Sequence, residues 1–232
     1  MNGDATVFGV NFADGRIKGY PKFWPGTSTA KTCFVLYVRG NNSYGKNQFV
    51  DNSNGTISDK ATGLMWLKYD SGYLKARTNK DGKLNWQQVL AWAEGLDYAG
   101  HSDWRLPNAK ELQSIVDYTR APDITQSAAI DPIFQITDYT DANGNTNYYF
   151  YWSSTTHKSS ASTGTYACYV AFGEAQGYMS FAGSAYQLLD VHGAGAQRSD
   201  PKSGAPAAYP YGWGPQGDVI AIYNMVRPVR NE

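Results

Sequence analysis

The eleven residues SDWRLPNAKEL, numbers 102–112, carry the clearest structural signal in this chain. Asn108 is a favourable helix N-cap, and Glu111 lies three residues later, where its carboxylate can accept a hydrogen bond from the N–H of the cap. Pro107 restricts Leu106 to extended geometry, so the helix cannot begin earlier. This order predicts a strand, a sharp corner and a helix.

The residues on either side of Pro107 indicate how this unit packs. Trp104 and Leu106 alternate with polar neighbours, as in a short half-buried strand, and Leu112, Ile115 and Val116 form an apolar stripe with helical spacing. We therefore predict a helix over residues 109–118. Aromatic and capping residues of this kind usually serve packing, so we assign the stretch to the scaffold and not to a ligand site.

Composition excludes several classes of partner. The chain has 232 residues, and its 20 Lys and Arg balance its 20 Asp and Glu, so nucleic acid and anionic membranes are not expected partners. No segment is long and apolar enough for membrane insertion. Aromatic residues reach 15% and Gly numbers 24, a combination typical of short strands, tight turns and an aromatic surface in secreted binding proteins. Residues 1–4 show no signal peptide, so an exported protein would be represented here by a processed piece.

The two cysteines do not make a disulfide framework. Cys33 and Cys168 each lie in an apolar, strand-like run, at residues 32–38 and 166–172. We expect two buried free thiols, and one disulfide between them stays open.

Several further elements are predicted. Residues 48–51 and 56–59 form a hairpin around Asn54-Gly55, followed by a strand at 64–67. Asn85 caps a second helix that ends near Gly95. Later strands are expected at residues 150–154, 166–172 and 219–229, and residues 190–217 are expected to form one long loop, which in a compact domain is usually functional or mobile.

An internal echo bears on domain organisation. The pattern of residues 10–20 resembles that of 170–178, and residues 35–40 resemble 222–228, in the same order. We therefore expect residues 1–47 to be the closing strands of a preceding partial repeat and residues 48–232 to be one complete domain. The alternative is that residues 1–47 add strands to a single sheet.

At this point the chain resembles the Lcl C-terminal domain family, long catalogued as a domain of unknown function. The order and spacing of the matching motifs cover roughly residues 48–232. These motifs are DxxTGLMW at 59–66, Trp86 with Ala91, GxxDWRLPNxxEL at 100–112, IDPxF at 130–134, YWSS at 151–154 and VRPVR at 226–230. Pro228 stands where the family often has cysteine, which removes one possible disulfide partner.

The resemblance implies an α+β fold of the C-type-lectin-like kind, related to the formylglycine-generating enzyme scaffold. Two helices would pack on twisted antiparallel sheets with long loops. Members of the family are typically bacterial, exported or surface-attached, and sometimes tandem. The best known relatives are adhesins that bind sulfated glycans. Fold alone does not fix function, because one scaffold can display different loops.

An enzyme is not expected. His101, His157 and His192 are far apart in sequence, and the pair formed by His192 and the nearby Asp190 does not by itself make a catalytic site. Formylglycine-generating enzymes use paired cysteines, whereas Cys168 stands alone here. An enzyme of that type is retained only as a third hypothesis, and it predicts that Cys33, Cys168 or His192 cluster around a pocket.

A metal site is only weakly indicated, and no other cofactor is expected. Asp141, Asn143 and Asn145 offer oxygen ligands at alternate positions, as calcium loops do. A downstream bidentate glutamate is missing, and a hairpin turn at Asn143-Gly144 explains the same residues.

Ligand binding has the most support. Aromatic faces and planar polar groups hold sugars, and the late part of the chain offers such groups at Tyr186, His192, Arg198, Tyr209, Tyr211 and Trp213. The alternative is that these rings pack the long loop onto the body. We predict a non-enzymatic extracellular or cell-surface module that recognises a glycan or surface ligand, in the manner of an adhesin. A structural repeat unit of a bacterial surface assembly is the second hypothesis, and oligomers are compatible with either.

Overall fold

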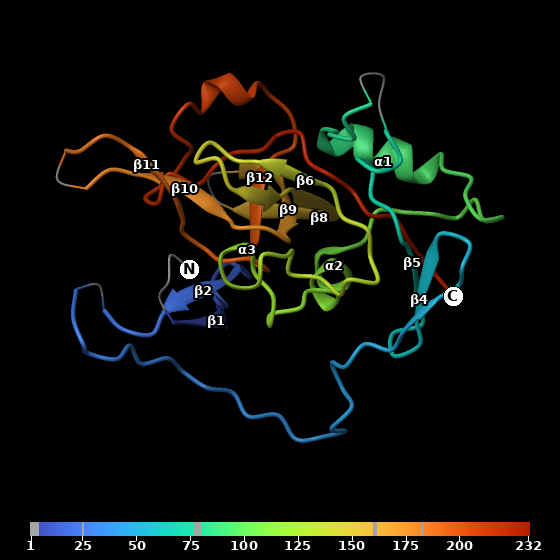
Figure 1. The fold of residues 1–232 in the computed structure, drawn as a ribbon, viewed down its shortest axis with the longest axis horizontal. Helices are drawn as coiled ribbons and strands as arrows, with labels where there is room; N and C mark the ends of the chain where they lie inside the picture. Colours follow the sequence, from blue (N-terminus) through green and yellow to red (C-terminus); the bar gives the residue numbers. More distant parts are fainter. Residues whose placement is uncertain (1–4, 25, 77–79, 160–161, 182) are drawn as a thin grey trace.

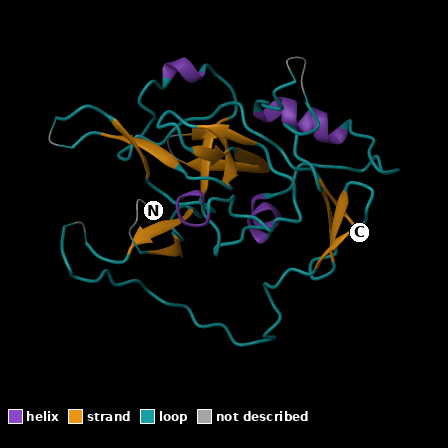
Figure 2. Cartoon of the chain, in the orientation of Figure 1, coloured by secondary structure: helices purple, strands orange, loops and turns teal. Residues whose placement is uncertain are grey.

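The computed structural model describes residues 5–24, 26–76, 80–159, 162–181 and 183–232. Within these residues the chain is built mainly from antiparallel strands, with three short α-helices (Figure 1; Figure 2). The sheets meet around a shared core, and the helices pack beside them. The coarse α+β class is therefore confirmed, with sheet as the main component.

The central sheet has five strands in the order β1-β2-β12-β9-β8. Its longest pair is β8 (Phe150–Ser159) with β9 (Ser162–Ala171). The apolar runs at 150–154 and 166–172 predict two strands here, but β8 continues five residues beyond its predicted end and β9 begins four residues before its predicted start. On the other side of β9 lies β12 (Gln197–Pro201). The prediction of one long loop at 190–217 is wrong here. Residues 197–201 form a strand that pairs from Gln197↔Val170 to Pro201↔Tyr166, and this tertiary pairing overrides the loop-like composition.

The sheet is extended by an N-terminal hairpin. β1 (Thr6–Val10) pairs with β2 (Ile17–Pro21), and β2 meets β12 at Ile17↔Gln197. In sequence, β1 and β2 resemble β9 and β10 (Gln176–Met179). However, β9 and β10 do not pair with each other, and β10 pairs instead with β11 (Gln187–Asp190). The two halves of that echo thus have different pairings.

A second sheet of four strands has the order β13-β5-β4-β3. β3 (Phe49–Asp51) and β4 (Thr56–Asp59) form the predicted hairpin, and Gly55 adopts a φ of 87°, which suits glycine. β5 (Leu64–Leu67) follows as predicted, and β13 (Val229–Asn231) pairs with it at the end of the chain. A smaller hairpin joins β6 (Asp138–Thr140) to β7 (Thr146–Tyr148).

Both predicted capping boxes are present. α1 (Trp86–Glu94) is capped by Asn85, and α2 (Ala109–Ser114) is capped by Asn108. α2 ends four residues before the predicted end at 118. The reason is that Val116 forms a β-bridge with Ile130, so the chain leaves the helix to join another segment. A further single turn, α3 (Pro122–Thr125), was not predicted.

The stretch at residues 102–112 belongs to the scaffold. Trp104 is buried, and its indole N–H donates to the Tyr98 carbonyl at 3.1 Å. Arg105 makes two hydrogen bonds of 2.8 Å to the Glu111 carboxylate, and its backbone pairs with Val229 of β13. The corner therefore ties α2 to the last strand.

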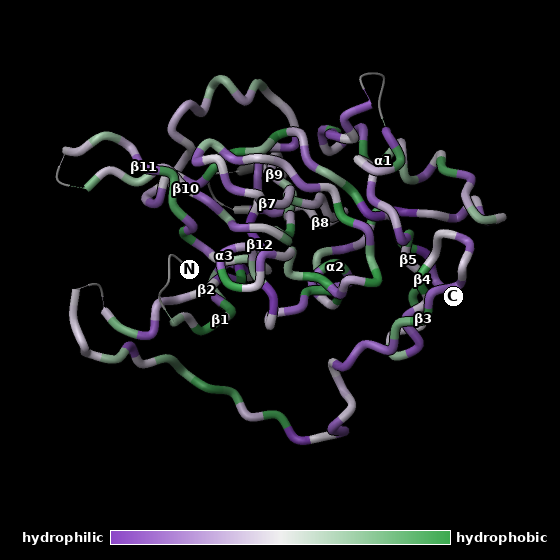
Figure 3. The backbone as a smooth tube through the Cα atoms, in the orientation of Figure 1, coloured by the Kyte–Doolittle hydropathy of each residue, from purple (hydrophilic) through white to green (hydrophobic). Residues whose placement is uncertain are grey.

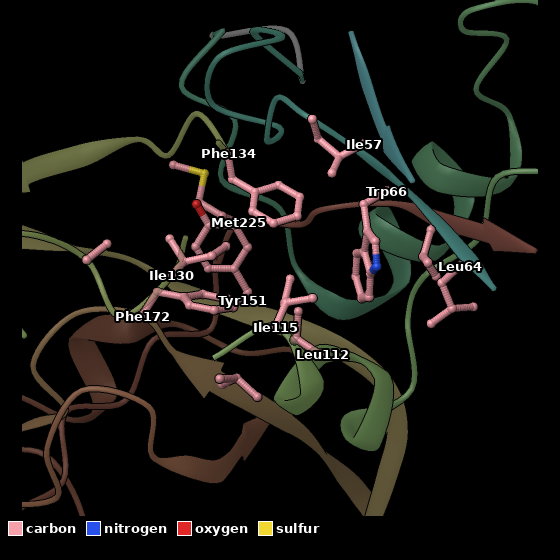
Figure 4. Close-up of a cluster of buried hydrophobic side chains, with 13 residues drawn as sticks. Ile57, Leu64, Trp66, Leu112, Ile115, Ile130, Phe134, Tyr151, Phe172 and Met225 are labelled. Carbon is pink, nitrogen blue, oxygen red and sulfur yellow. The ribbon is translucent and has the colours of Figure 1, made fainter. Parts of the chain in front are cut away.

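The core lies on both faces of the β8–β9 pair. One face carries Tyr151, Val170 and Phe172 into a cluster shown in Figure 4, where they meet Phe134 and Met225. The other face carries a second cluster, built from Phe150, Trp152, Tyr169, Ala171, Val226 and residues around α1. Because both faces are buried, these strands read as nearly continuous apolar runs.

The closing segment is less regular than predicted. Of the expected strand at 219–229, only Val229 lies in a strand, β13. Residues 222–228 thread between layers and make isolated bridges, such as Asn224 with Leu84 and Met225 with Tyr151. Arg227 is fully buried in this segment. Its side chain donates to three backbone carbonyls, which replaces strand pairing as the means of fixing the segment.

The prediction for residues 32–38 is wrong. They form no strand, and Cys33 is exposed, not buried, because the segment runs outside the body between the N-terminal hairpin and β3 (Figure 1). The same stretch stands out as hydrophobic in Figure 3. Cys168 is buried as predicted, and both thiols are free. No strand in the described part of the chain pairs with this apolar stretch.

Candidate functional site

Four of the six predicted ligand residues, Tyr186, Arg198, Tyr211 and Trp213, line two adjoining pockets. We call them the polar pocket, of about 370 Å³, and the tyrosine pocket, of about 390 Å³. Trp213, Gly214 and Pro215 line both, so the loop that carries Trp213 separates them. The polar pocket is also lined by Arg16, His157, Tyr166, Arg198, Ser199, Asp218 and Ile220. The tyrosine pocket is also lined by Tyr178, Met179, Ser180, Tyr186, Tyr211, Gly212 and Gly217.

A tight loop positions Trp213. The backbone N–H groups of Trp213 and Asp218 donate to each other's carbonyls, at 2.9 and 2.8 Å, and close residues 213–218 as a clip. Gly212 precedes the clip with a φ of 68°, and a Cβ there would lie 2.1 Å from the Gly217 carbonyl oxygen. Only glycine fits such a close approach of two backbone segments. The indole is therefore presented on a stiff support while 64% of the residue stays exposed.

Stacked rings form the wall of the tyrosine pocket. Tyr186 and Tyr211 stack with ring centroids 4.2 Å apart and an interplanar angle of 16°, and Tyr178 meets Tyr211 edge-on at 6.1 Å. Tyr186 and Tyr211 are about half exposed. Tyr209 does not line either pocket, but its ring lies edge-on to Trp213 at 6.3 Å. Rings preorganised in this way lose little conformational entropy when they bind a ligand.

Asp218 organises the charged groups of the polar pocket. It accepts a hydrogen bond from Arg198, and its Oδ1 lies 2.9 Å from His192 Nε2. Burial raises the pKa of the Asp218 carboxyl, but His192 and Arg198 together hold that pKa below its usual value. Asp218 is therefore a carboxylate at neutral pH and fixes the direction of the Arg198 side chain.

His192 is a support of the pocket, not part of its surface. Its side chain is 1% exposed, and burial lowers its pKa although Asp218 opposes that shift. The neutral imidazole faces the Asp218 carboxylate through Nε2, and among the described residues neither buried ring nitrogen has a partner in good hydrogen-bond geometry. The sequence suggested that His192 pairs with Asp190. In the structure the imidazole contacts Asp218, 26 residues later in the chain.

Three further polar groups of this pocket were missed from the sequence. Arg16 comes from the N-terminal hairpin and pairs with Asp14. His157 Nδ1 and Ser199 Oγ lie 2.9 Å apart, from β8 and β12 on the two sides of β9. Burial and the nearby Arg16 lower the pKa of His157. Only the strand order brings residues 16, 157 and 199 together, so no local motif could reveal them.

The arrangement suits recognition of a polar ligand. Arg16 and Arg198 supply fixed guanidinium donors, Ser199 supplies a hydroxyl, and Trp213 supplies an exposed aromatic face at the rim. Few polar groups on a rigid framework, beside aromatic surface, are typical of small-ligand sites. Ser199 and His157 together add a hydroxyl and an imidazole to the polar lining.

The weak calcium candidate is a hairpin turn. Asp141 Oδ1 accepts hydrogen bonds from the backbone N–H groups of Asn143 and Asn145, both at 2.9 Å, and its Oδ2 accepts one from the Gln176 side chain at 2.7 Å. The carboxylate therefore closes the turn between β6 and β7. Within the described ranges, no group of three His, Cys, Asp or Glu residues is placed to hold a metal ion.

The residues that the hypothesis of a formylglycine-generating type of enzyme requires do not line one pocket. Cys33 lies on the exposed segment outside the body, Cys168 is buried in β9, and His192 lies behind Asp218. Burial raises the pKa of the Cys168 thiol to about 11, so it is a poor nucleophile at neutral pH.

Comparison with known proteins gives one family match. A family model described as the Lcl C-terminal domain matches residues 55–191. No curated protein and no solved structure matches the chain. In the part of the chain that the structure describes, none of the helices has the length and apolar character needed to cross a bilayer.

Proposed function

This chain belongs to the Lcl C-terminal domain family, and we propose that it is a non-enzymatic binding module that holds a glycan or another surface ligand in the polar and tyrosine pockets. The observation that carries the proposal is the exposed Tyr186–Tyr211 stack, which lies beside Trp213 and the Arg198–Asp218 pair. It places apolar ring faces and fixed polar donors within one continuous surface.

The aromatic groups support a sugar ligand because pyranose rings present apolar C–H faces. Trp213, Tyr186 and Tyr211 each stay more than half exposed, although large aromatic rings usually bury when a loop packs on a body. The clip at 213–218 and the ring stack hold them in place without a ligand. A surface prepared in this way has a small ordering cost on binding.

The polar groups support a ligand with several hydroxyl or acidic groups. Arg16 and Arg198 are each fixed by a carboxylate partner, so their remaining N–H donors have defined directions. Asp14 and Asp218 compensate these two charges, which favours recognition by directed hydrogen bonds over attraction by net charge.

Family membership extends the proposal to fold type and location. We infer a C-type-lectin-like arrangement, in which long loops at one end of a sheet display the ligand site, and an extracellular or cell-surface location. The aromatic-rich, low-charge composition supports the second inference.

A glycan array tests the function. Wild type is expected to bind a subset of glycans, and the double variant Tyr211→Ala, Trp213→Ala is expected to lose them. The matched control is Tyr69→Ala, Tyr73→Ala, because Tyr69 and Tyr73 form a comparable stack with centroids 5.1 Å apart and line neither pocket.

The two double variants separate the site from general loss of fold. Binding that is retained in the control and lost in the site variant supports the proposal. Absence of binding by wild type, or equal binding by wild type and the site variant, would contradict it. Arg16→Gln then tests the polar pocket, since it removes one guanidinium and leaves the Arg198–Asp218 pair in place.

A second candidate function is a structural unit of a surface assembly. The observation that favours it is the uncovered apolar surface of residues 5–47. Sedimentation of the chain with and without residues 1–42 distinguishes the candidates, because an unchanged folded monomer after the deletion would count against a structural role for that segment.

A further inference from the structure

One segment of the chain has the sequence of a buried strand and the environment of a surface loop. Residues 32–38, which we call the donor segment, read TCFVLYV and carry no charge, with Lys31 and Arg39 on either side. Its side chains are almost fully in solvent, with relative exposures of 107% for Phe34, 94% for Tyr37 and 91% for Val38. Contiguous apolar surface of this kind marks an interaction site.

The backbone of the donor segment is as unpartnered as its side chains. Within the described part of the chain, no hydrogen bond joins residues 32–40 to another residue, whereas both flanks are attached to the body. The N–H of Lys31 donates to the Lys22 carbonyl at 2.9 Å, and the N–H of Gln48 donates to Asp59 Oδ1 at 2.8 Å. The segment is thus held away from the body between two fixed points (Figure 1).

The same part of the chain also carries an open sheet edge. β1 pairs with β2 on one side, and no other strand of the described residues pairs with it. Val7 and Val10 on β1 are more than half exposed, and Phe12 beyond it is 81% exposed. An open edge with apolar side chains accepts an added strand unless something covers it.

Exposed apolar residues are concentrated in this region. Eleven of the nineteen large hydrophobic side chains that are exposed in the described residues lie within residues 5–47, which hold about a fifth of the chain. The polar and tyrosine pockets explain only three of the others, Tyr186, Tyr211 and Trp213.

We propose that two copies of this chain form a symmetric dimer in which the donor segment of each copy adds as a strand to the β1 edge of the other. The chain supplies both a strand without a sheet and a sheet edge without a strand, so the partner that fits both at once is a second copy. A two-fold axis uses both pairs of surfaces reciprocally, so the donor segment and the β1 edge of each copy are both occupied within the dimer. Strand addition provides the main-chain hydrogen bonds that residues 32–40 lack.

The dimer goes beyond the proposed binding function and does not depend on it. The tyrosine pocket is built from residues 178–217, and neither the donor segment nor β1 lines either pocket. Failure of the glycan experiment would therefore leave the dimer untouched, and the reverse also holds.

Sedimentation velocity of the full chain over a wide range of concentrations tests the dimer. A reducing agent is present throughout, so that a disulfide between two Cys33 thiols cannot hold copies together. Leu36→Asp places a charge in the donor segment, and Leu36→Pro removes a backbone donor there without adding charge. Both variants leave the monomer intact, because Leu36 is 77% exposed and contacts no core element. Val7→Lys places a charge on the acceptor edge.

Ile124→Asp on α3 is the matched control, since Ile124 is an equally apolar side chain, 68% exposed, outside residues 5–47. The expected result is a dimer for wild type and the control, and a monomer for the donor and acceptor variants. A wild type that stays monomeric at every concentration would overturn the proposal. A dimer that persists in either Leu36 variant or in Val7→Lys would overturn it as well, because association would then use another surface.

Discussion

Replacement of Arg227 by methionine tests how the closing segment is fixed in the core. The Arg227 side chain is fully buried, and its guanidinium donates to the carbonyls of Leu67, Lys68 and Gln135 at 2.9, 2.6 and 2.7 Å. The same group lies over the Phe134 ring, 5.0 Å from its centroid. These contacts join the last segment to the end of β5 and to the stretch that follows Phe134.

The size of the effect follows from the groups that lose their donor. Lys68 O also accepts from the Gln135 N–H, so two carbonyls bear most of the loss. An unsatisfied buried polar group costs about 1–3 kcal/mol, and loss of the cation–π contact adds about 1 kcal/mol. Removing a buried cation offsets part of this cost, because its desolvation is no longer required. We expect a net loss of about 3 kcal/mol in the free energy of unfolding for Arg227→Met.

Urea denaturation followed by tryptophan fluorescence measures this loss. With an m-value of about 3 kcal/mol per molar, the midpoint should fall by about 1 M. Arg230→Met is the control, because Arg230 lies three residues later and pairs with Asp103 at the surface. The urea midpoint of this variant should stay close to that of wild type. If the midpoints of Arg227→Met and wild type coincide, the guanidinium does not fix the segment and the reasoning fails.

Three further predictions concern other parts of the molecule. Burial raises the pKa of Asp190 to about 7. Between about pH 4 and 7 the Asp190 carboxyl is therefore protonated in the folded state and ionised in the unfolded state. The free energy of unfolding of wild type should fall as pH rises through that window. Asp190→Asn should flatten this part of the stability–pH curve, and a parallel curve would contradict the assignment. Exposed Cys33 should react with a thiol reagent in the folded monomer, while buried Cys168 should react only on unfolding. Rapid reaction of the remaining thiol in folded Cys33→Ser would refute this. Gly212→Ala should abolish ligand binding, because the added Cβ would meet the Gly217 carbonyl. Gly214→Ala should bind the ligand far better, because Gly214 has a similar φ but open space around its Cα. Equal binding by the two variants would show that the clip does not position Trp213.

Local signals predicted the scaffold well. The caps at Asn85 and Asn108 fix where α1 and α2 begin, and Asn54-Gly55 fixes the β3–β4 hairpin, because each depends on residues within a few positions of one another. The end of α2 could not be predicted in the same way. It depends on the pairing of Val116 with Ile130, a contact that local sequence does not encode.

The sequence predicted the aromatic half of the site and, in the polar half, Arg198. Tyr211 and Trp213 stand in a glycine-rich loop where rings have few reasons to occur, and the structure leaves both exposed. The polar half depends on Arg16, His157 and Ser199, which three strands bring together from distant positions. The prediction for residues 32–38 was wrong for a different reason. Their composition predicts a buried strand, but no strand among the described residues pairs with them.

In the proposed function, the exposed rings beside the polar pocket bind a ligand. Isothermal titration calorimetry with the strongest glycan from the array, applied to wild type, Tyr211→Ala, Trp213→Ala and the control Tyr69→Ala, Tyr73→Ala, tests it most directly. We predict that the site variant loses at least about tenfold in affinity, or about 1.4 kcal/mol, while the control matches wild type. Equal affinities for the site variant and wild type would contradict the account.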